Sequence, residues 1–313
     1  MQALSAEDYL TKLLAVPRPN AQAVLAFYEH RVGAICTDAR LLLAPLDDHL
    51  CHRGDGIFES IAYRERRLFQ LDAHLERMKN SAAGLNIVPP CPWEEVRQRI
   101  IDVAQAGGEP VGGIRVLIGR GAGGFGISPQ ECPQASLYII ALRGHVPTEA
   151  FYAKGLAAFR SAIPAKQEYL ARIKNTNYLP NVLMSEEART KGMDVAITFD
   201  AHNCMAEAAI ANVGIVDASG CLVLPEFTNA LPGTTAIRAM ELAEAAGKCV
   251  QQRAIPAAEL DTVQEMLFFS SSPLCVAITS FDGKPVRDGK PGAFALWLKG
   301  ALLQAMLAEG TAF

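Results

Sequence analysis

The sequence lacks several features that would place it in a specialised class. Its 313 residues contain no apolar run of about eighteen residues and no basic-then-apolar signal pattern near the N-terminus, so we expect no membrane partner and no secretion. There is no excess of positive charge, because 29 Lys and Arg residues stand against 33 Asp and Glu residues. This balance argues against a nucleic-acid partner, which usually requires a basic surface.

The eight cysteines are scattered along the chain, and no two of them form a C-x-x-C pair. Zinc sites and disulfide-rich domains place their cysteines at short, regular spacings. We therefore expect no metal site and no disulfide framework. The pattern fits a reducing cytoplasm, which is where we expect the protein to work.

Half of the residues are apolar and 20% are charged, which is typical of a globular protein, and the chain is long enough for two domains with separate cores. Ser5 and Asp8 form a capping box for a first helix, and a second helix is expected over residues 21–30. We expect the apolar face of the first helix to dock on its own domain, and a dimer contact is the alternative. The expected divisions are a helical extension at 1–30, a small α/β domain at 31–148 and a large domain at 149–313.

Hydrophobic periodicity predicts the main elements of both domains. In the small domain the expected strands are 57–63, 67–71, 112–119 and 136–142, and the expected helices are 74–84 and 93–106. In the large domain the expected strands are 195–199, 206–211, 266–270 and 275–280, and the expected helices are 178–191, 234–246 and 293–308.

Residues 166–212 contain two groups that are costly to bury alone. Lys174 lies just ahead of the helix expected at 178–191, for which Asn177 is the candidate N-cap. Glu207 is the one acid in the apolar strand expected at 206–211. Taken singly, Lys174 also fits a solvated lysine, and Glu207 also fits a salt-bridged strand residue.

Together these two groups suit pyridoxal 5′-phosphate. A lysine amine can bond the aldehyde of this cofactor, and an anion opposite the pyridine nitrogen keeps that nitrogen protonated. The phosphate needs hydrogen-bond donors, and the N-terminus of a helix supplies them. Gly233, Thr234 and Thr235 open the helix expected at 234–246, although such a start also fits an ordinary helix cap.

Residues 119–124, which read G-R-G-A-G-G after an expected strand, formally match a dinucleotide-binding motif. The following residues, F-G-I-S-P at 125–129, cannot open the helix that such a site requires, so we reject a dinucleotide site and expect a loop that closes over a pocket. Arg115 in the strand and Arg120 in the loop flank this region, and either residue also fits a purely structural role.

Five segments, in one order, resemble the class IV (fold type IV) pyridoxal-phosphate aminotransferases. They are RGDGIFE at 53–59, DAHLER at 72–77, KNTNYLPN at 174–181, Glu207 with Asn212, and LPGTT at 231–235. The resemblance covers about residues 40–300. It implies a two-domain α/β (α+β) fold with a smaller N-terminal α/β domain and a larger C-terminal mixed-sheet pseudo-barrel domain.

The resemblance also implies roles for individual residues. Lys174 would hold the cofactor as a Schiff base and move a proton between Cα and C4′, Glu207 would face the ring nitrogen, and Tyr178 would face the ring oxygen. The other cofactor-binding residues would be Arg77, Asn212, Gly233, Thr234, Thr235 and Ser272. The substrate-binding residues would be Phe58, Ser60, Arg115 and Arg120.

The implied reaction is amino transfer between an amino acid and a 2-oxo acid, in a homodimer whose sites borrow a loop from the partner. Gly113 stands where branched-chain enzymes have a tyrosine, and the segments at 128–133 and 177–183 look most like plant-type D-amino-acid aminotransferases. The loop at 119–124 also resembles that of aminodeoxychorismate lyase. Four alternatives remain: a D-amino acid substrate, a branched-chain L-amino acid substrate, a lyase on the same site, or a non-catalytic protein that retains the fold.

Overall fold

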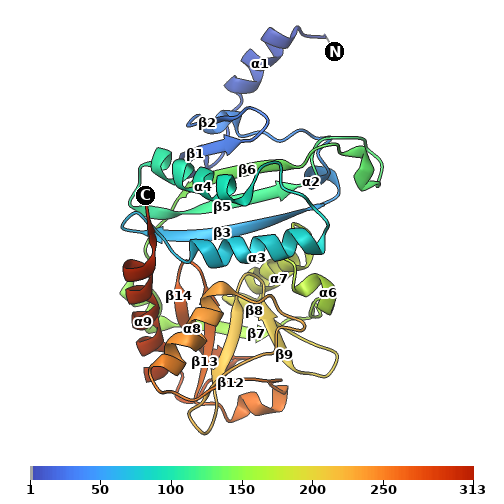
Figure 1. The fold of residues 1–313 in the computed structure, drawn as a ribbon. Helices are drawn as coiled ribbons and strands as arrows, with labels where there is room; N and C mark the ends of the chain where they lie inside the picture. Colours follow the sequence, from blue (N-terminus) through green and yellow to red (C-terminus); the bar gives the residue numbers. More distant parts are fainter. Residues whose placement is uncertain (1–2) are drawn as a thin grey trace.

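The computed structural model describes residues 3–313, which fold around two β-sheets that lie one above the other in Figure 1. Within these residues one sheet has seven strands and the other has nine. Most strands of the seven-stranded sheet come from the first half of the chain and those of the nine-stranded sheet from the second half; with their helices, the two sheets are called the small and the large domain below. No helix in the described part of the chain is both long enough and apolar enough to span a membrane.

The seven-stranded sheet takes strands from both ends of the chain, in the order β16-β4-β3-β5-β6-β1-β2. Every neighbouring pair in it is antiparallel. Its strands are β1 (Val24–Glu29), β2 (Ala34–Cys36), β3 (Gly56–Arg64), β4 (Arg67–Leu68), β5 (Val111–Gly119), β6 (Ser136–Arg143) and β16 (Thr311–Ala312). The predicted strands of this region are confirmed, although β4 is shorter than predicted.

Two helices, α3 (Leu71–Gly84) and α4 (Trp93–Gly107), cover one face of this sheet. In α4 the apolar residues Val96, Ile100 and Val103 recur at helical spacing, and all three are fully buried against the sheet. Because side chains alternate along a strand, the odd-numbered residues of β3 face these helices and the even-numbered residues face the large domain.

In the nine-stranded sheet the strands β10-β13-β14-β7-β8-β9 form a closed six-stranded barrel, because β9 also pairs with β10. Strands β11, β12 and β15 extend it outside the ring. The ring strands are β7 (Leu156–Arg160), β8 (Val195–Phe199), β9 (Met205–Ala208), β10 (Asn212–Val216), β13 (Glu265–Ser270) and β14 (Leu274–Phe281). The others are β11 (Leu222–Leu224), β12 (Val250–Gln252) and β15 (Lys284–Pro285). Since β7 runs parallel to β8 and β14 while the remaining ring pairs are antiparallel, the predicted mixed sheet is confirmed.

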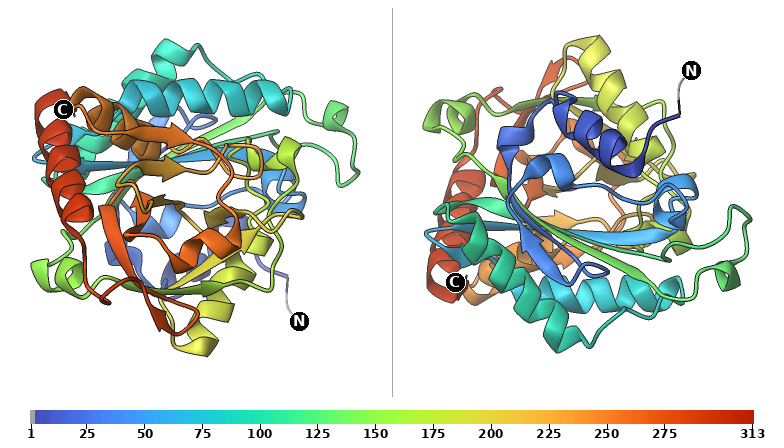
Figure 2. Two further views of the ribbon diagram at one scale, coloured as in Figure 1. Left: turned by 90° about the horizontal axis from the view of Figure 1, so that it is seen from below. Right: turned by 90° about the horizontal axis from the view of Figure 1, so that it is seen from above.

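Helices surround the barrel, and α9 runs along one side of the molecule in both views of Figure 2. The longer ones are α7 (Leu179–Lys191), α8 (Thr234–Ala245) and α9 (Ala293–Glu309), and the shorter ones are α5 (Glu149–Lys154) and α6 (Glu168–Ala171). The short helix α2 (His49–His52) instead packs against β5 of the seven-stranded sheet. Single 3-10 turns are η1 (Ala21–Ala23), η2 (Ala39–Leu41), η3 (Pro129–Glu131) and η4 (Ala257–Asp261). In α9, Leu298 and Leu302 are fully buried, whereas Leu296 is 49% exposed.

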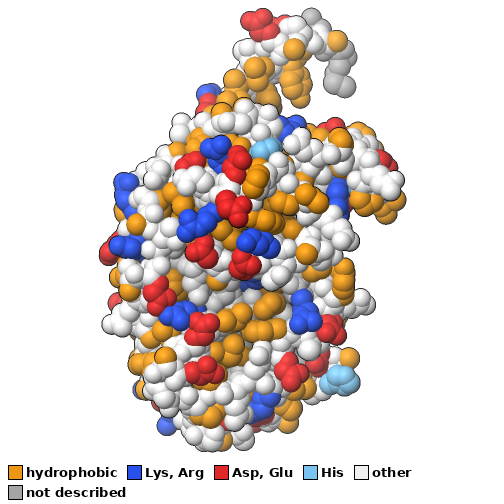
Figure 3. Space-filling view, in the orientation of Figure 1, with side chains coloured by type: hydrophobic (Ala, Val, Ile, Leu, Met, Phe, Trp, Pro, Cys, Tyr) orange, Lys and Arg blue, Asp and Glu red, His pale blue; other side chains and the backbone are white. Residues whose placement is uncertain are grey.

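The N-terminal extension differs from the prediction in two ways. Helix α1 (Ala6–Ala15) begins at the predicted cap, where the Ser5 hydroxyl accepts a hydrogen bond from the Asp8 amide. However, the helix projects from the body with none of its residues buried, so the expected docking on its own domain is wrong (Figures 1 and 3). The second helix expected at 21–30 is also wrong, because β1 occupies 24–29. An apolar run of that length predicts a buried strand as well as it predicts a helix.

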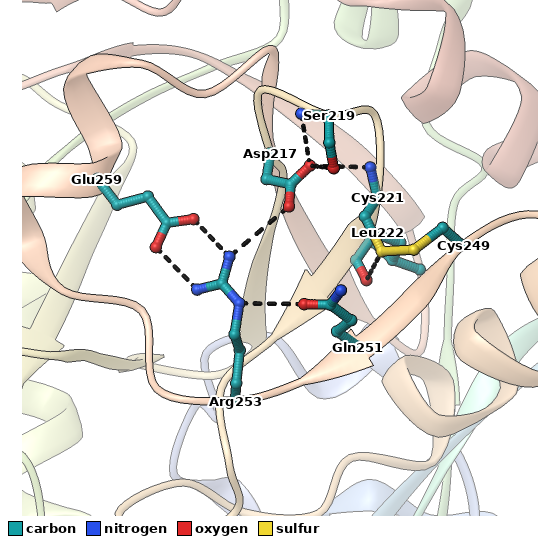
Figure 4. Close-up of a disulfide and its surroundings, with 8 residues drawn as sticks. All are labelled: Asp217, Ser219, Cys221, Leu222, Cys249, Gln251, Arg253 and Glu259. Carbon is teal, nitrogen blue, oxygen red and sulfur yellow. Dashed lines mark hydrogen bonds and ion pairs between the residues drawn. A yellow bond between two sulfur atoms is a disulfide. The ribbon is translucent and has the colours of Figure 1, made fainter.

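One disulfide joins Cys221 to Cys249, which the scattered spacing of the cysteines did not lead us to expect (Figure 4). The two residues are 28 positions apart, and they immediately precede β11 and β12. These strands pair in parallel with Leu222 opposite Val250, which brings the two sulfurs together. The bond closes the segment that contains α8, an arrangement that sequence spacing alone does not reveal.

Candidate active site

A cavity of about 530 Å³ lies between the two sheets, a size typical of a small-molecule site. Both domains contribute to its wall. The predicted site residues that line it are Phe58, Ser60, Arg77, Arg115, Lys174, Tyr178, Glu207, Asn212, Gly233, Thr234, Thr235 and Ser272. Arg120 is the one predicted site residue that lies elsewhere.

Lys174 reaches the cavity because its backbone is attached to the edge of β3. The Phe58 amide donates to the Lys174 carbonyl at 2.9 Å, and Asn175 forms an isolated β-bridge with Ile57. From the other side, the Lys174 amide donates to the Ser81 hydroxyl on α3 at 3.1 Å. The segment before α7 is thus fixed by the small domain, although it belongs to the large one.

The Lys174 amine carries no ion pair or hydrogen bond within residues 3–313, and it lies 4.7 Å from the centre of the Phe58 ring. Burial, reinforced by the nearby positive charge of Arg77, lowers the pKa of Lys174 to about 8. A substantial fraction of this amine is therefore neutral near pH 8, which is the state that a nucleophile or a base requires.

Tyr178 packs edge-on against Phe58, with ring centroids 4.9 Å apart. Burial and the negative charge of Glu207 raise the pKa of Tyr178 to about 12, so its hydroxyl stays protonated and can donate. Tyr178 is also the N-cap residue of α7, so the prediction that Asn177 occupies this place is wrong. The Asn177 amide instead donates to the Gly54 carbonyl, because the preceding segment is held to β3.

Glu207 lies on β9 at the opposite side of the cavity and is only 8% exposed. One of its oxygens accepts a hydrogen bond from the Leu231 amide at 3.0 Å, and the other is 3.6 Å from the Lys166 amine. Burial raises the pKa of Glu207, and the charge of Lys166 only partly opposes this effect. Lys166 had not been predicted as a site residue, since nothing in its sequence neighbourhood distinguishes it from a surface lysine.

Asn212 lies directly opposite Glu207 in the barrel and holds the same loop. Its side-chain amide donates to the Leu231 carbonyl at 2.7 Å, so both polar groups of Leu231 are fixed by neighbouring side chains. A Cβ atom at Gly233 would fall 1.7 Å from the Asn212 side-chain oxygen. Only glycine therefore allows the loop to approach this asparagine and turn into α8.

Helix α8 begins at the cavity, and its first turn has no side-chain cap within the described residues. The first amides of a helix have no intrahelical acceptor, so those of Thr234, Thr235 and Ala236 are available to an anion. Thr234 and Thr235 are both buried in the wall, while Ser272 reaches the same cavity from the turn after β13. Together these groups make one end of the cavity suitable for a phosphate.

Arg77 projects from α3 toward the same end. Two of its nitrogens donate to the Glu59 carboxylate at 2.8 and 2.7 Å, and a third donates to the Pro232 carbonyl at 3.2 Å. His74 Nδ1 lies 2.7 Å from Glu59, and His74 Nε2 lies 3.2 Å from the Thr234 hydroxyl. Glu59 and His74 occur in the segments that carry the family resemblance, but their roles emerge only from these contacts between distant elements.

The two predicted substrate arginines have different surroundings. Arg115 extends into the open part of the cavity beside Ser60, its neighbour across the β3–β5 pair, and has no ion pair within the described chain. Arg120 donates to both oxygens of Asp55, at 2.9 and 3.0 Å, and to two backbone carbonyls. In this single chain Arg115 is therefore available to a ligand, and Arg120 is not.

The residues present fit the cofactor that the sequence predicts. Three groups face one cavity: a lysine amine and a helix start that have no side-chain partner within residues 3–313, and a buried carboxylate with spare acceptor capacity. These groups match an aldehyde, a ring nitrogen and a phosphate respectively. The arrangement can hold the cofactor at three points while leaving Arg115 for the substrate.

Comparison with known proteins agrees with this geometry. Residues 56–281 match the amino-transferase class IV family. The chain is 33% identical to a chloroplastic D-amino-acid transaminase of Arabidopsis thaliana, over 91% of this chain and 77% of the relative. It is 25% identical to a D-alanine aminotransferase of Bacillus licheniformis, over 84% of this chain and 92% of the relative. A solved T.th. branched-chain amino acid aminotransferase with pyridoxamine 5′-phosphate superposes with a TM-score of 0.85 at 25% identity, covering 91% of this chain and 94% of that one.

Proposed function

The chain belongs to the class IV aminotransferase family and is a pyridoxal-phosphate-dependent transaminase, and from this premise we propose that Lys174 is the lysine that holds the cofactor. We propose D-amino acids as its amino donors and 2-oxo acids as its acceptors. The 33% identity to a D-amino-acid transaminase supports this choice of donor. The observation that carries the proposal is that Lys174 and Glu207 face one cavity from opposite sides.

When bound, pyridoxal 5′-phosphate supplies an aldehyde for an amine and a ring that withdraws electrons from the substrate Cα. Glu207 would accept a hydrogen bond from the protonated ring nitrogen, and Tyr178 would donate one to the ring oxygen. Arg77, Thr235 and the first amides of α8 would hold the phosphate. Phe58 and Tyr178 form an aromatic wall beside the ring position and keep water from the Lys174 amine.

Lys174 would also carry the proton that leaves the substrate Cα. A base at neutral pH needs a pKa close to the working pH, and the pKa of Lys174, lowered to about 8, meets this requirement. Because the Lys174 backbone is anchored to β3 and α3, the amine moves only by rotation of its own side chain.

The test is to reduce the cofactor-loaded protein with borohydride and to locate the modified lysine by peptide mapping. We expect the label on Lys174 and its loss in Lys174→Ala, because Lys166, the other lysine that lines the cavity, lies beside Glu207 on the opposite side. Lys166→Met is the matched control, since Lys166 lines the same cavity and should leave the label in place. A label on Lys166 would contradict the assignment.

We further propose that Arg115 receives the substrate carboxylate, since an arginine can bind both carboxylate oxygens at once. Arg115→Lys should raise the KM for the donor by about tenfold to a hundredfold, in line with about 1.5 to 3 kcal/mol for a hydrogen bond to a charged group. Arg120→Lys is the matched comparison. A larger effect at Arg120 would contradict the assignment and place the carboxylate beside the 119–124 loop.

A donor panel of D and L forms of several amino acids, read by keto-acid release, tests the substrate. We expect turnover of the D forms and an absolute need for a 2-oxo acid acceptor. Selective turnover of branched-chain L-amino acids would replace the proposed donor, and turnover without an acceptor would favour a lyase.

We also propose that the chain acts as a homodimer. We propose as well that it has a small domain at 31–148 and a large domain at 149–313. Apolar side chains that remain exposed near the cavity support a partner, namely Leu179 and Val182 on α7 and Ile210 in the cavity wall. The boundary expected for the extension at 1–30 needs adjustment, since residues 24–29 already belong to the first sheet.

A further inference from the structure

A chain of polar contacts joins the small domain to the start of α8. Arg77 is bound through two nitrogens to Glu59, Glu59 is bound to His74, and His74 reaches the Thr234 hydroxyl. The two inner members, Glu59 and His74, are each 1% exposed. The two outer members, Arg77 and Thr234, line the cavity and come from different domains.

The direction of each hydrogen bond follows from the chemistry of its members. Glu59 is ionised, because Arg77 and His74 overcome the effect of burial and lower its pKa to about 2. An ionised carboxylate only accepts, so His74 donates to it from Nδ1. Burial lowers the pKa of His74, which makes the neutral ring the stable form. Its Nε2 is then an acceptor, and the Thr234 hydroxyl must donate to it.

This direction has a consequence for the cavity. A hydroxyl has one proton, and Thr234 donates it in the hydrogen bond to His74, so the Thr234 side chain has no donor left for an anion. Thr235, which forms no such contact within the described residues, keeps its hydroxyl proton. The Thr234 amide is unaffected, because it belongs to the uncapped first turn of α8.

We propose that Glu59 and His74 are positioning residues that hold Arg77 and the first turn of α8 at the separation a phosphate requires. This inference rests on the proposed function. Glu59 fixes the plane of the Arg77 guanidinium and leaves two of its five N–H groups for the phosphate. His74 ties Thr234 to the small domain, so that the two halves of the phosphate site, which lie on separate domains, keep one geometry.

The experiment compares the binding of two probes to cofactor-free protein by absorbance titration. The probes are pyridoxal 5′-phosphate and pyridoxal, which have the same ring and aldehyde but differ in the phosphate. We expect Glu59→Gln to raise the Kd for the phosphorylated probe at least about tenfold and to leave the Kd for pyridoxal within about twofold. His74→Asn keeps a donor for Glu59 but removes the contact with Thr234. We expect it to raise the same Kd about fivefold.

Glu265→Gln is the matched control, because Glu265 is also a buried glutamate, accepting hydrogen bonds from the Phe294 and Ala295 amides at the start of α9. Glu265 lies outside the cavity wall, so Glu265→Gln should change the Kd for neither probe. The double variant Thr234→Val with His74→Asn should raise the Kd for pyridoxal 5′-phosphate no more than His74→Asn alone. Both substitutions remove the same contact, the one between His74 and Thr234.

Equal weakening of both probes in Glu59→Gln and His74→Asn would overturn the proposal, because it would assign the network to the fold and not to the phosphate. Unchanged binding of both probes would overturn it as well. If Glu59→Gln does not fold, His74→Asn alone decides between these outcomes. A wild-type protein that does not prefer the phosphorylated probe would contradict the proposed function, and this result is distinguishable from a failure confined to the variants.

Discussion

A buried glutamate lies near each end of the cavity, Glu207 in its wall and Glu59 behind Arg77, and the two are held very differently. Glu59, at the phosphate end, receives two hydrogen bonds from Arg77 and one from His74, at 2.7 to 2.8 Å. Glu207, at the ring-nitrogen end, receives one from the Leu231 amide, while its nearest cation, Lys166, stays 3.6 Å away. Both side chains are almost completely removed from water.

The pKa values of the two carboxyls move in opposite directions as a result. Strong partners lower the pKa of Glu59 to about 2, whereas burial without a full set of partners raises the pKa of Glu207. A carboxylate with a complete set of partners stabilises the fold. One left with spare acceptor capacity lowers the stability of the empty protein and is suited to a ligand that brings its own proton. The comparison therefore separates an acid that positions its neighbours, Glu59, from one that keeps an acceptor free for the cofactor, Glu207.

Glu207→Gln should give the largest effect. Loss of the anion opposite the ring nitrogen should lower kcat by about 10² to 10³, the range found when one electrostatic partner of a transition state is removed. The variant should also stabilise the cofactor-free protein at neutral pH, because the raised pKa means that burying the charge costs free energy there. This gain should fade as the pH falls toward the ordinary carboxyl pKa of about 4.3.

Turnover assays and urea unfolding of the cofactor-free protein at several pH values measure the two halves of this prediction. Glu265→Gln again serves as the buried control, and it should lower stability with little loss of kcat. If Glu207→Gln destabilised the empty protein, the Glu207 carboxylate would stabilise the fold as that of Glu59 does, and the contrast between the two acids would be wrong.

Glu59→Gln should give the opposite sign of stability change. Removing one partner of a buried ion pair costs about 3 to 5 kcal/mol, and Glu59→Gln removes the negative charge and one of the two acceptor oxygens that Arg77 and His74 share. Because the pKa of Glu59 is lowered in the fold, its contribution is present above the ordinary carboxyl pKa and is lost as the pH falls from about 4.3 to about 2.

Urea unfolding between pH 2 and pH 7 tests this window. The wild-type protein should lose stability across it more steeply than Glu59→Gln, so that the two curves converge near pH 2. Parallel curves would mean that Glu59 is not the group whose protonation weakens the fold in acid.

The sequence identified Glu207 as a site residue but did not reveal the role of Glu59, and the reason is physical. Glu207 stands alone in an apolar strand, and Lys174 lies just before a helix start, so local pattern and family motifs were enough to single them out. Glu59 is flanked by similar strand residues, and its partners lie 15 and 18 positions away on another element. Contacts of this kind depend on how α3 packs on β3, which no local signal records.

The same dependence on contacts between distant segments explains the other differences between the predictions and the structure. The main strands and helices of both domains were predicted because their periodicity is local, and the fold class followed from the family motifs. The disulfide depends on the parallel pairing of β11 with β12, and the use of residues 24–29 as a strand depends on a neighbour, β6, more than a hundred residues away. Likewise, the difference between Arg115 and Arg120 is decided by Asp55, which accepts from only one of them.

Lys166→Met should give the smallest of the three effects and tests how the Glu207 end is balanced. The Lys166 amine is the nearest cation to Glu207 and lies 5.1 Å from the centre of the Tyr178 ring, with its side chain 20% exposed. Because its charge lowers the pKa of Glu207 against the effect of burial, its loss should raise that pKa further. The acidic limb of the kcat/KM profile should then move to higher pH, with a fall in rate of less than about tenfold at neutral pH.

A pH profile of the variant beside that of Lys191→Met measures this shift. Lys191 pairs with Glu187 on α7, outside the cavity wall, so its loss should leave the acidic limb in place. If Lys166→Met leaves the limb unmoved, burial and the remaining partners set the pKa of Glu207, and the ion pair with Lys166 adds nothing to the difference between the two acids. If the limb moves, the charge of Lys166 helps to set the pKa of Glu207, and the 3.6 Å separation between them matters for function. A lysine amine at hydrogen-bonding distance would occupy a Glu207 oxygen, as Arg77 occupies the oxygens of Glu59, and would leave no acceptor for the ring nitrogen.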